Sequence, residues 1–212
     1  MATLISVASG KGGVGKSVVS ANLALALAKR GRQVILADLD VGGADAHIMF
    51  GELNPSVTLT DFLNKRVNRL IEAAIPITMH PNLRLIAGTG DTLATANMAY
   101  ARKKRLMKQF RELESDIVVL DIGAGTNFHA LDFFLMADLH VAVATPEPTS
   151  VLDLYRFIKL AAIRRVLACF LARSPMSEVL SNRDFTSVEE VMEVAGATDA
   201  GGRDVAAAAL QS

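Results

Sequence analysis

The sequence predicts an α/β fold in which a doubly wound, mainly parallel sheet carries helices on both faces. Three observations predict it: short apolar runs recur along the chain, longer stretches with helical patterning separate them, and a glycine-rich segment follows the first run. Short runs rich in Val, Ile and Leu, without polar alternation, are typical of strands buried on both faces of a parallel sheet. Helices between such strands form right-handed crossovers, which wind the sheet on both sides.

The predicted elements alternate along the chain as this fold requires. Strands are predicted at 3–8, 33–37, 83–87, 117–120 and 139–144. Helices are predicted at 16–30, 92–113, 150–172, 187–195 and 203–210. The first helix is expected to pack through Val19, Leu23, Ala26 and Leu27, and Gly31 marks its end.

The pattern changes after residue 172, where short helices follow one another without another strand. No linker rich in Gly, Pro or Ser divides the chain, so we expect 1–172 to form an α/β core and 173–212 a helical segment of the same domain. A helix that leaves a parallel strand normally returns the chain to another strand. The sheet is therefore expected to lack its last strands, and either a helical cap or a domain cut short explains this.

Composition excludes several classes of protein. The 212 residues carry 22 basic and 22 acidic side chains, so a dedicated nucleic-acid binder with a basic surplus is not expected. The single Cys169 excludes an internal disulfide framework and is expected to be a buried small apolar residue. No signal peptide or membrane-spanning run is recognisable, and we expect a cytoplasmic protein.

Residues 10–17 read Gly-Lys-Gly-Gly-Val-Gly-Lys-Ser and fit the pattern G-x-x-x-x-G-K-[ST]. The segment lies between a predicted strand and a predicted helix, where backbone N–H groups and the helix N-terminus can hold an anion. Lys16 is expected to reach the β- and γ-phosphates and Ser17 to bind Mg²⁺. The expected nucleotide-binding residues are Gly10, Gly12, Gly13, Val14, Gly15, Lys16, Ser17 and Val18.

Carboxylates stand at the ends of two predicted strands. Asp38 and Asp40 end the second strand, and Asp121 follows the apolar run 117–120. Ligands of open α/β sheets bind at the carboxyl ends of the strands, so these groups are placed for a metal ion or a water molecule. For Asp38, turn chemistry or helix capping remains an alternative.

The second lysine of the loop, Lys11, makes the pattern K-G-G-x-G-K-[ST], which resembles the deviant Walker A motif of the ParA/MinD family of P-loop ATPases. The segment VILADLDVGGAD resembles the switch I of that family, and IVVLDIGAG resembles its Walker B motif and switch II. The resemblance implies that the chain binds ATP and Mg²⁺ and forms a homodimer with two nucleotides between the subunits.

The resemblance also implies roles for individual residues. Lys11 would reach the nucleotide of the partner subunit, and Asp40 would orient the attacking water. Asp121 would hold a Mg²⁺-bound water, Asp38 would support the Mg²⁺ shell, and Gly125 would bring a backbone N–H to the γ-phosphate.

The segment LDFFLMADLHVAVATPEPTSVLDLYRFIK resembles the FlhG (FleN, YlxH) group within this family. The resemblance implies a slowly hydrolysing regulatory ATPase that controls flagellar number or placement through a protein partner. Its Pro-Glu-Pro-Thr-Ser segment is equally explained by a turn from strand to helix, in which Thr149 or Ser150 caps the helix. Division-site or cargo positioning and a non-hydrolysing nucleotide-binding scaffold are the alternatives.

The sequence departs from the family pattern in two ways. The family reads adenine with an Asn on a later strand, and Asn182 lies in a polar segment without that context. Many members bind membrane through a basic amphipathic C-terminal helix, whereas residues 204–212 are not basic. Peripheral contact with the inner face of the cell membrane would need a C-terminal segment outside this sequence. Nucleic acid is not an expected partner, because the basic run 102–105 is typical of a solvated helix face.

Overall fold

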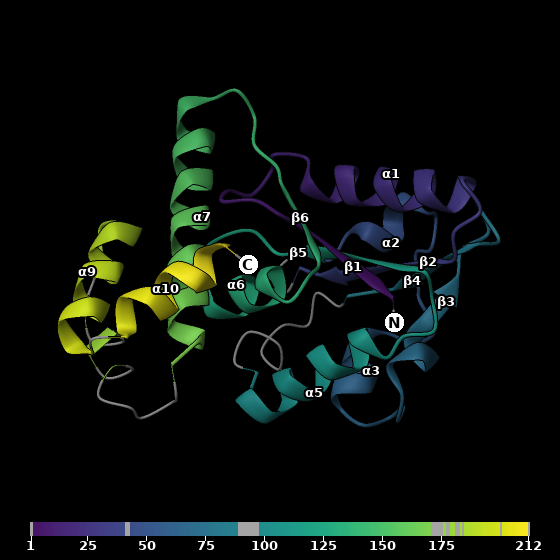
Figure 1. The fold of residues 1–212 in the computed structure, drawn as a ribbon. Helices are drawn as coiled ribbons and strands as arrows, with labels where there is room; N and C mark the ends of the chain where they lie inside the picture. The colour runs from purple at the N-terminus through teal and green to yellow at the C-terminus, as the bar shows by residue number, and fades with distance from the viewer. Residues whose placement is uncertain are drawn as a thin grey trace.

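The computed structural model is built around a six-stranded sheet with helices on both faces (Figure 1). The structure describes residues 2–40, 43–88, 98–170, 176, 179–180, 183, 185–199 and 201–211. The strands are β1 (Thr3–Ala8), β2 (Val34–Leu39), β3 (Ala74–Pro76), β4 (Leu83–Ile86), β5 (Ile117–Ile122) and β6 (Leu139–Ala142). They lie in the order β3-β4-β2-β5-β1-β6, and only the β3–β4 pair is antiparallel. The predicted doubly wound, mainly parallel α/β fold is confirmed.

Two hydrophobic cores lie on opposite faces of this sheet. The first face is covered by α1 (Lys16–Lys29) and α2 (Ala46–Met49). The second face is covered by α3 (Leu59–Leu63), a 3₁₀ turn (Leu70–Ala73), α5 (Tyr100–Arg111), α6 (Phe128–Leu135) and part of α7 (Pro148–Ala168). The second core is the richer in aromatic side chains, with Phe62, Phe110 and Phe157 fully buried.

The packed face of helix α1 agrees with the predicted one in part. Leu23 and Leu27 are partly buried against the core, as predicted, whereas Val19 is 37% exposed and Ala26 is exposed. The most buried positions of the helix are Lys16, Ser20, Ala21, Ala24 and Ala28, because small residues let the helix backbone approach the strands closely.

The predicted strand 139–144 is shorter and less buried than expected. It spans Leu139–Ala142, and Leu139 is 56% exposed. The prediction of burial on both faces is wrong here because β6 stands at the end of the strand order and pairs only with β1 among the described residues. A strand at the edge of a sheet needs no apolar cover on its outer side.

Two predicted strands extend further than expected at their carboxyl ends. The structure continues β2 to Leu39 and β5 to Ile122, so that Asp38 and Asp121 lie inside the sheet.

Strand β3 was not predicted, since it has only three residues and ends in a proline at the opposite edge of the sheet. Helix α5 begins at Tyr100, and residues 92–97 of the predicted helix 92–113 lie outside the described residues.

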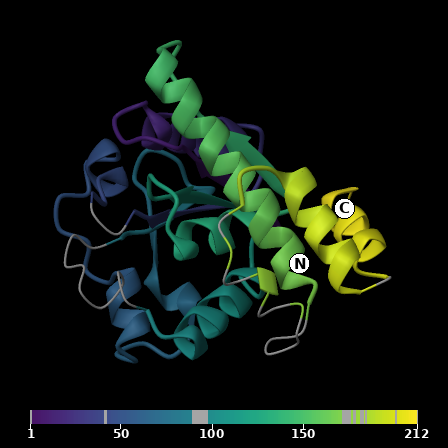
Figure 2. The same cartoon turned by 90° about the vertical axis from the view of Figure 1, so that its left-hand side faces the viewer.

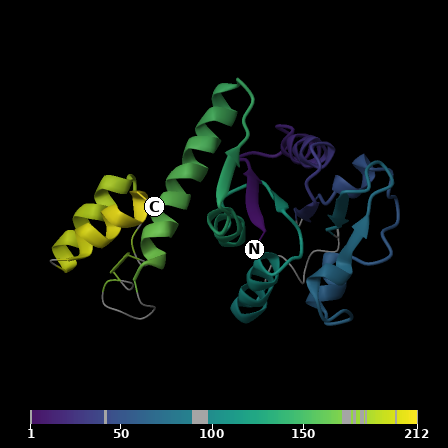
Figure 3. The same ribbon diagram turned by 45° about the vertical axis from the view of Figure 1, so that its right-hand side comes forward.

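Helix α7 links the sheet to a helical pair at the C-terminal end. Its second half packs against α9 (Val188–Thr198) and α10 (Gly202–Gln211) through a third hydrophobic cluster around Val166, Val191 and Ala206 (Figures 2 and 3). Cys169 follows α7 and is exposed, so the expectation that it is buried is wrong. None of the described helices is long and apolar enough to cross a membrane.

Candidate functional site

The loop of residues 10–17 leads from β1 into α1, as the sequence predicts. Gly13 and Gly15 have φ values of +80° and +88°, a backbone conformation that favours glycine. Gly15 is the N-cap residue of α1, so the helix N-terminus opens into this loop. The arrangement directs backbone N–H groups and the positive end of the helix dipole toward one anion-sized space.

Gly10 is required for a separate reason. A Cβ at this position would lie 2.2 Å from the backbone carbonyl carbon of Asp153 on α7. The loop therefore packs directly against the N-terminal half of α7, and any larger residue would push one of the two elements aside.

A cavity of about 310 Å³ opens above the loop. Its lining includes Lys11, Gly12, Gly13, Gly15, Lys16, Ser17, Val18 and Asp40, all of which were predicted site residues. It also includes Ser9, Gly43, Asp45, Met49 and Ala124, which were not. Asp45 could have been found, because it ends the segment VGGAD that follows β2. Gly10, Val14, Asp38, Asp121 and Gly125 do not line this cavity.

Lys16 forms a buried ion pair at the base of the cavity. Its ammonium donates a hydrogen bond of 2.7 Å to Oδ1 of Asp121 and lies 3.7 Å from Oδ2 of Asp40. The side chain of Lys16 is only 6% exposed and that of Asp121 is fully buried. A buried cation of this kind needs an anionic partner, and these carboxylates supply it.

The second oxygen of Asp121 remains open. Oδ1 also accepts a hydrogen bond of 3.0 Å from the Ser20 hydroxyl, whereas Oδ2 is buried and has no hydrogen-bond partner among the described residues. Buried carboxylate oxygens are nearly always paired, so an unpartnered one indicates a place for a ligand or a water molecule. A carboxylate oxygen can accept a hydrogen bond from a water molecule bound to Mg²⁺.

Asp38 lies beside Asp121 on the neighbouring strand, in direct register. Its Oδ1 accepts a hydrogen bond from the backbone N–H of Asp40 at 3.0 Å, and its Oδ2 accepts one from Ala46 at 3.1 Å. Burial, together with the charge of Asp121, raises the pKa of Asp38 to about 7. Since both oxygens hold the loop that precedes α2, the geometry favours the turn-chemistry alternative for Asp38.

Asp40 lies at the rim of the cavity, against the segment that follows β5. A Cβ on Gly123 would stand 3.2 Å from Oδ1 of Asp40, so the glycine leaves room for this carboxylate. Gly125, two residues further on, has φ of +94° and donates its N–H to the Ser9 carbonyl at 3.3 Å. The loop after β5 is thereby tied to the start of the phosphate loop.

Lys11 points toward the N-terminal end of α7. Its ammonium donates a hydrogen bond of 3.3 Å to the Thr149 hydroxyl and lies 3.9 Å from Oε2 of Glu147. The expectation that Thr149 or Ser150 caps the helix is wrong: Glu147 is the N-cap residue of α7, and Ser150 instead accepts a hydrogen bond from the Thr145 N–H. The Pro-Glu-Pro-Thr-Ser segment thus contacts Lys11, a link that sequence reasoning missed.

Metal binding at this site would depend on few protein ligands. Within the described ranges, no group of three or more His, Cys, Asp and Glu side chains is placed to hold a metal ion. Mg²⁺ is commonly held by one or two side chains together with water and substrate phosphates. The open oxygen of Asp121 and the hydroxyl of Ser17 fit that mode.

A scan against protein-family models matches residues 1–171 to the ParA model described as "NUBPL iron-transfer P-loop NTPase". The chain belongs to the ParA family of P-loop NTPases. The predicted membership of the ParA/MinD family is confirmed by this match, which covers most of the chain.

Curated relatives of this ParA-family chain include two of the FlhG group. Antiactivator FleN of Pseudomonas aeruginosa is 35% identical over 74% of this chain and 55% of its own length. The flagellum site-determining protein YlxH of Helicobacter pylori is 34% identical over 74% of this chain and 52% of its own length. The septum site-determining protein MinD of the same organism is 28% identical over 92% of this chain and 75% of its own length. The chain thus spans about half the length of FleN and YlxH.

Solved structures show the same fold. The cell division ATPase MinD of Pyrococcus furiosus superposes with a TM-score of 0.65 at 30% identity, covering 74% of this chain and 65% of that one. MinD of Pyrococcus horikoshii, complexed with Mg-ADP, has a TM-score of 0.63 at 28% identity, covering 72% of this chain and 62% of that one. Asn182, the residue considered for adenine recognition in this ParA-family chain, lies outside the described residues.

Proposed function

We propose that the chain is a regulatory ATPase that binds Mg·ATP, dimerises with two nucleotides between the subunits, hydrolyses them slowly and then separates. The observation that carries the proposal is the buried Lys16–Asp121 pair beneath the phosphate loop, with one oxygen of Asp121 left open. Family membership supports ATP as the nucleotide, since the MinD of P. horikoshii is complexed with Mg-ADP.

Nucleotide binding would exchange the partners of Lys16. Its ammonium would move from Asp121 and Asp40 to the β- and γ-phosphates, while the N–H groups of the loop surround the β-phosphate. The residues proposed to hold the nucleotide remain Gly10, Gly12, Gly13, Val14, Gly15, Lys16, Ser17, Val18 and Gly125. Gly10 would act indirectly, because it sets the contact between the loop and α7.

The metal site is proposed to use Ser17 and Asp121, with Asp38 supporting the loop around it. Once Lys16 leaves Oδ1, both oxygens of Asp121 can accept hydrogen bonds from metal-bound water. Bound Mg²⁺ would neutralise charge on the β- and γ-phosphates. Asp38 holds the backbone at Asp40 and Ala46 and so fixes where Asp40 stands.

Hydrolysis is proposed to depend on Asp40 and Lys11. Asp40 lines the cavity and would hold the attacking water by accepting its proton in a hydrogen bond. Lys11 would leave Thr149 and Glu147 and reach the γ-phosphate on the partner subunit, as an arginine finger does. A cation placed in this way accelerates phosphoryl transfer by about 10³–10⁵-fold.

The cellular role is proposed from the relatives. FleN is named an antiactivator and YlxH a flagellum site-determining protein, and each is about one third identical to this chain. We infer control of flagellar number or placement through a protein partner, in the cytoplasm or at the inner face of the membrane. MinD relatives support the alternative of division-site positioning. Deleting the gene in its own organism and counting flagella and cell length separates the two: altered flagellation with normal length supports the first.

Isothermal titration with ATP and Mg²⁺ tests the nucleotide site. The unmodified chain is expected to bind, and Lys16→Ala to lose at least about tenfold in affinity, because the charge facing the phosphates is gone. Lys29→Ala is the matched control, since Lys29 is exposed at the far end of the same helix. Equal affinity in Lys16→Ala and the unmodified chain would refute the site. ATP binding without phosphate release in any oligomeric state would favour the non-hydrolysing scaffold.

A further inference from the structure

A groove lies on the outer side of the helices that cover the second face of the sheet, away from the phosphate loop. It is formed by α5, α6 and the second half of α7. Its cavity has a volume of about 530 Å³, larger than the 310 Å³ above the loop. The two cavities share no lining residue. The groove is therefore a feature that ATP binding does not explain.

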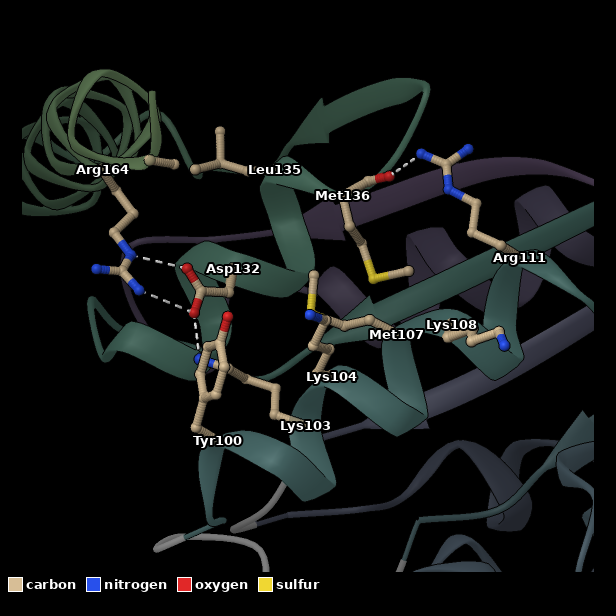
Figure 4. A pocket seen from close by; sticks show the side chains of 11 residues that line it. Tyr100, Lys103, Lys104, Met107, Lys108, Arg111, Asp132, Leu135, Met136 and Arg164 are labelled. Carbon is tan, nitrogen blue, oxygen red and sulfur yellow. Dashed lines mark hydrogen bonds and ion pairs between the residues drawn. The ribbon is translucent and has the colours of Figure 1, made fainter. Parts of the chain in front are cut away.

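The floor of the groove is apolar. Met107 of α5, Leu135 and Met136 at the end of α6, and Ala168 of α7 form it (Figure 4). Methionine side chains are unbranched and polarizable, and they adapt to apolar partners of different shape. An apolar floor with two methionines is typical of surfaces that accept a partner's Leu or Phe side chains.

The rim of the groove is strongly basic. Five cationic side chains line it, against Asp132 as the one carboxylate among the described lining residues. The chain as a whole has no net charge, so this local excess is not a reflection of composition. Its cations come from two helices that flank the floor, Lys104 and Lys108 from α5 and Arg164 from α7 (Figure 4).

These cations differ in whether each is already paired with a carboxylate. Lys103 and Arg164 both bind Asp132, and Arg111 binds Asp138 at 2.6 Å. Lys108 lies 3.5 Å from Glu112 on the solvent side, with its own side chain 75% exposed. Among the residues that the structure describes, Lys104 has no hydrogen bond or ion pair. Lys104 is thus available to an incoming anionic group, and the exposed Lys108 would have to exchange its pair with Glu112 for a contact with that group.

We propose that this groove docks an acidic amphipathic helix from a protein partner. Such a helix places apolar side chains on one face, which matches the Met107–Met136 floor, and carboxylates on its flanks, which match Lys104 and Lys108. A small anion fits less well, because Lys103, the most buried cation of the groove, is already neutralised by Asp132. A nucleic-acid backbone offers no apolar face for the floor.

Fluorescence anisotropy with a labelled synthetic peptide tests the proposal. The probe is a helical peptide of about 16 residues, with leucines spaced i, i+3, i+4, i+7 and glutamates on both flanks. The nucleotide-free chain is expected to bind it, and to bind it more weakly at high salt because the rim contacts are screened. K104E/K108E is expected to weaken binding by about tenfold or more. Met107→Gln is expected to weaken it by about fivefold through the floor.

Matched controls decide what the peptide recognises. Arg102→Glu makes the same charge reversal on an exposed residue of α5 that does not line the groove, and binding is expected to stay within about twofold. Replacing the peptide's leucines with serines while keeping its glutamates is expected to abolish binding.

Three results would overturn the proposal. If the serine peptide binds as tightly as the leucine peptide, the groove is a general anion site, and if R102E weakens peptide binding as much as K104E/K108E, the attraction is nonspecific electrostatics. If the protein binds phosphatidylglycerol vesicles but not the peptide, the groove is a membrane-binding surface. None depends on ATP, so this test and that of the proposed function fail separately.

Discussion

Two buried lysines face carboxylates in this structure, and the surroundings of the two pairs differ. Lys16 binds Asp121 beneath the phosphate loop, and Lys103 binds Asp132 between α5 and α6. Both lysines are 6% exposed. Asp121 keeps one oxygen without a partner, whereas Asp132 accepts hydrogen bonds from Lys103 and from two nitrogens of Arg164.

The unpartnered oxygen of Asp121 leaves the Lys16–Asp121 pair able to accept a new hydrogen-bond partner, whereas the hydrogen bonds around Asp132 are complete. Burial alone would raise the pKa of Asp132, but the hydrogen bonds from Arg164 and Lys103 outweigh it and hold that pKa below its ordinary value. The Asp132 cluster (Lys103, Asp132 and Arg164) thus joins α5, α6 and α7 as a closed network. The open pair at Asp121 retains hydrogen-bonding capacity that a ligand can use.

The largest expected effect comes from opening the closed cluster. Asp132→Ala leaves Lys103 and Arg164 facing each other without a carboxylate, and we expect a loss of about 3–5 kcal/mol in the free energy of unfolding. Urea denaturation followed by circular dichroism measures it. A loss below about 1 kcal/mol would show that solvent replaces Asp132 and that the cluster does not hold the three helices together.

The pH dependence of stability should have opposite signs at the two sites. Asp38, beside Asp121, has its pKa raised from 3.8 to about 7, so the native state keeps a proton that the unfolded state loses. Its contribution is present below pH 3.8 and is lost as pH rises toward 7, by up to about 4 kcal/mol in total. The contribution of Asp132 is present above its unfolded pKa of 3.8 and is lost as pH falls through its lower folded pKa.

Urea titrations of the nucleotide-free chain across this pH range check the first sign. Asp38→Asn removes the titrating group, so its stability should fall less between pH 4 and pH 7 than that of the unmodified chain. Parallel curves for the two proteins would show that the pKa of Asp38 is not raised.

A smaller effect on folding, together with an effect on binding, is expected from Asp121→Asn. The amide oxygen can still accept hydrogen bonds from Lys16 and Ser20, but Lys16 then keeps only the Asp40 carboxylate as an anionic partner, so the free energy of unfolding should fall by about 1–3 kcal/mol. The open position is no longer a carboxylate oxygen, and we expect the gain in ATP affinity on adding Mg²⁺ to fall by about 10–100-fold. Titration with ATP in Mg²⁺ and in EDTA measures this ratio. An unchanged ratio would mean that Asp121 does not support the metal.

The smallest effect is expected at an exposed pair. Arg156 lies 3.0 Å from Asp153 three residues earlier on α7, with its side chain 66% exposed. Arg156→Ala should cost no more than about 0.5 kcal/mol, because water screens such pairs. Urea denaturation of Arg156→Ala gives the reference value for Asp132→Ala. If the free energy of unfolding falls by a similar amount in the two variants, the buried pair does not contribute more to stability than the exposed pair.

The sequence predicted the residues around the Lys16–Asp121 pair, but it did not predict the Asp132 cluster. Residues 10–17 form a contiguous motif whose chemistry is local, and Asp38, Asp40 and Asp121 stand at strand ends that topology brings together. Lys103, Asp132 and Arg164 are separated by 29 and 32 positions and belong to no motif. Sequence reasoning placed Lys103 on a solvated helix face, and the structure corrects this because Asp132 draws it inward.

Packing details were also beyond the sequence for physical reasons. The contact of Lys11 with Thr149 and Glu147 depends on how closely α7 approaches Gly10, a distance that only the fold sets. The exposure of β6 depends on its place at the end of the strand order. Apolar periodicity predicts that a strand exists, but it does not say how many neighbours the strand has.

The central claim is that ATP, bound above the phosphate loop of residues 10–17, joins two copies of this chain into a dimer. Sedimentation velocity of Asp40→Ala with ATP and Mg²⁺ tests it most directly, because slow turnover then preserves the bound state. We predict a dimer with ATP, a monomer with ADP, and a monomer with ATP when Lys11→Ala is added but not when Lys29→Ala is added. A monomer under all of these conditions, in a chain that still binds ATP, would contradict the account.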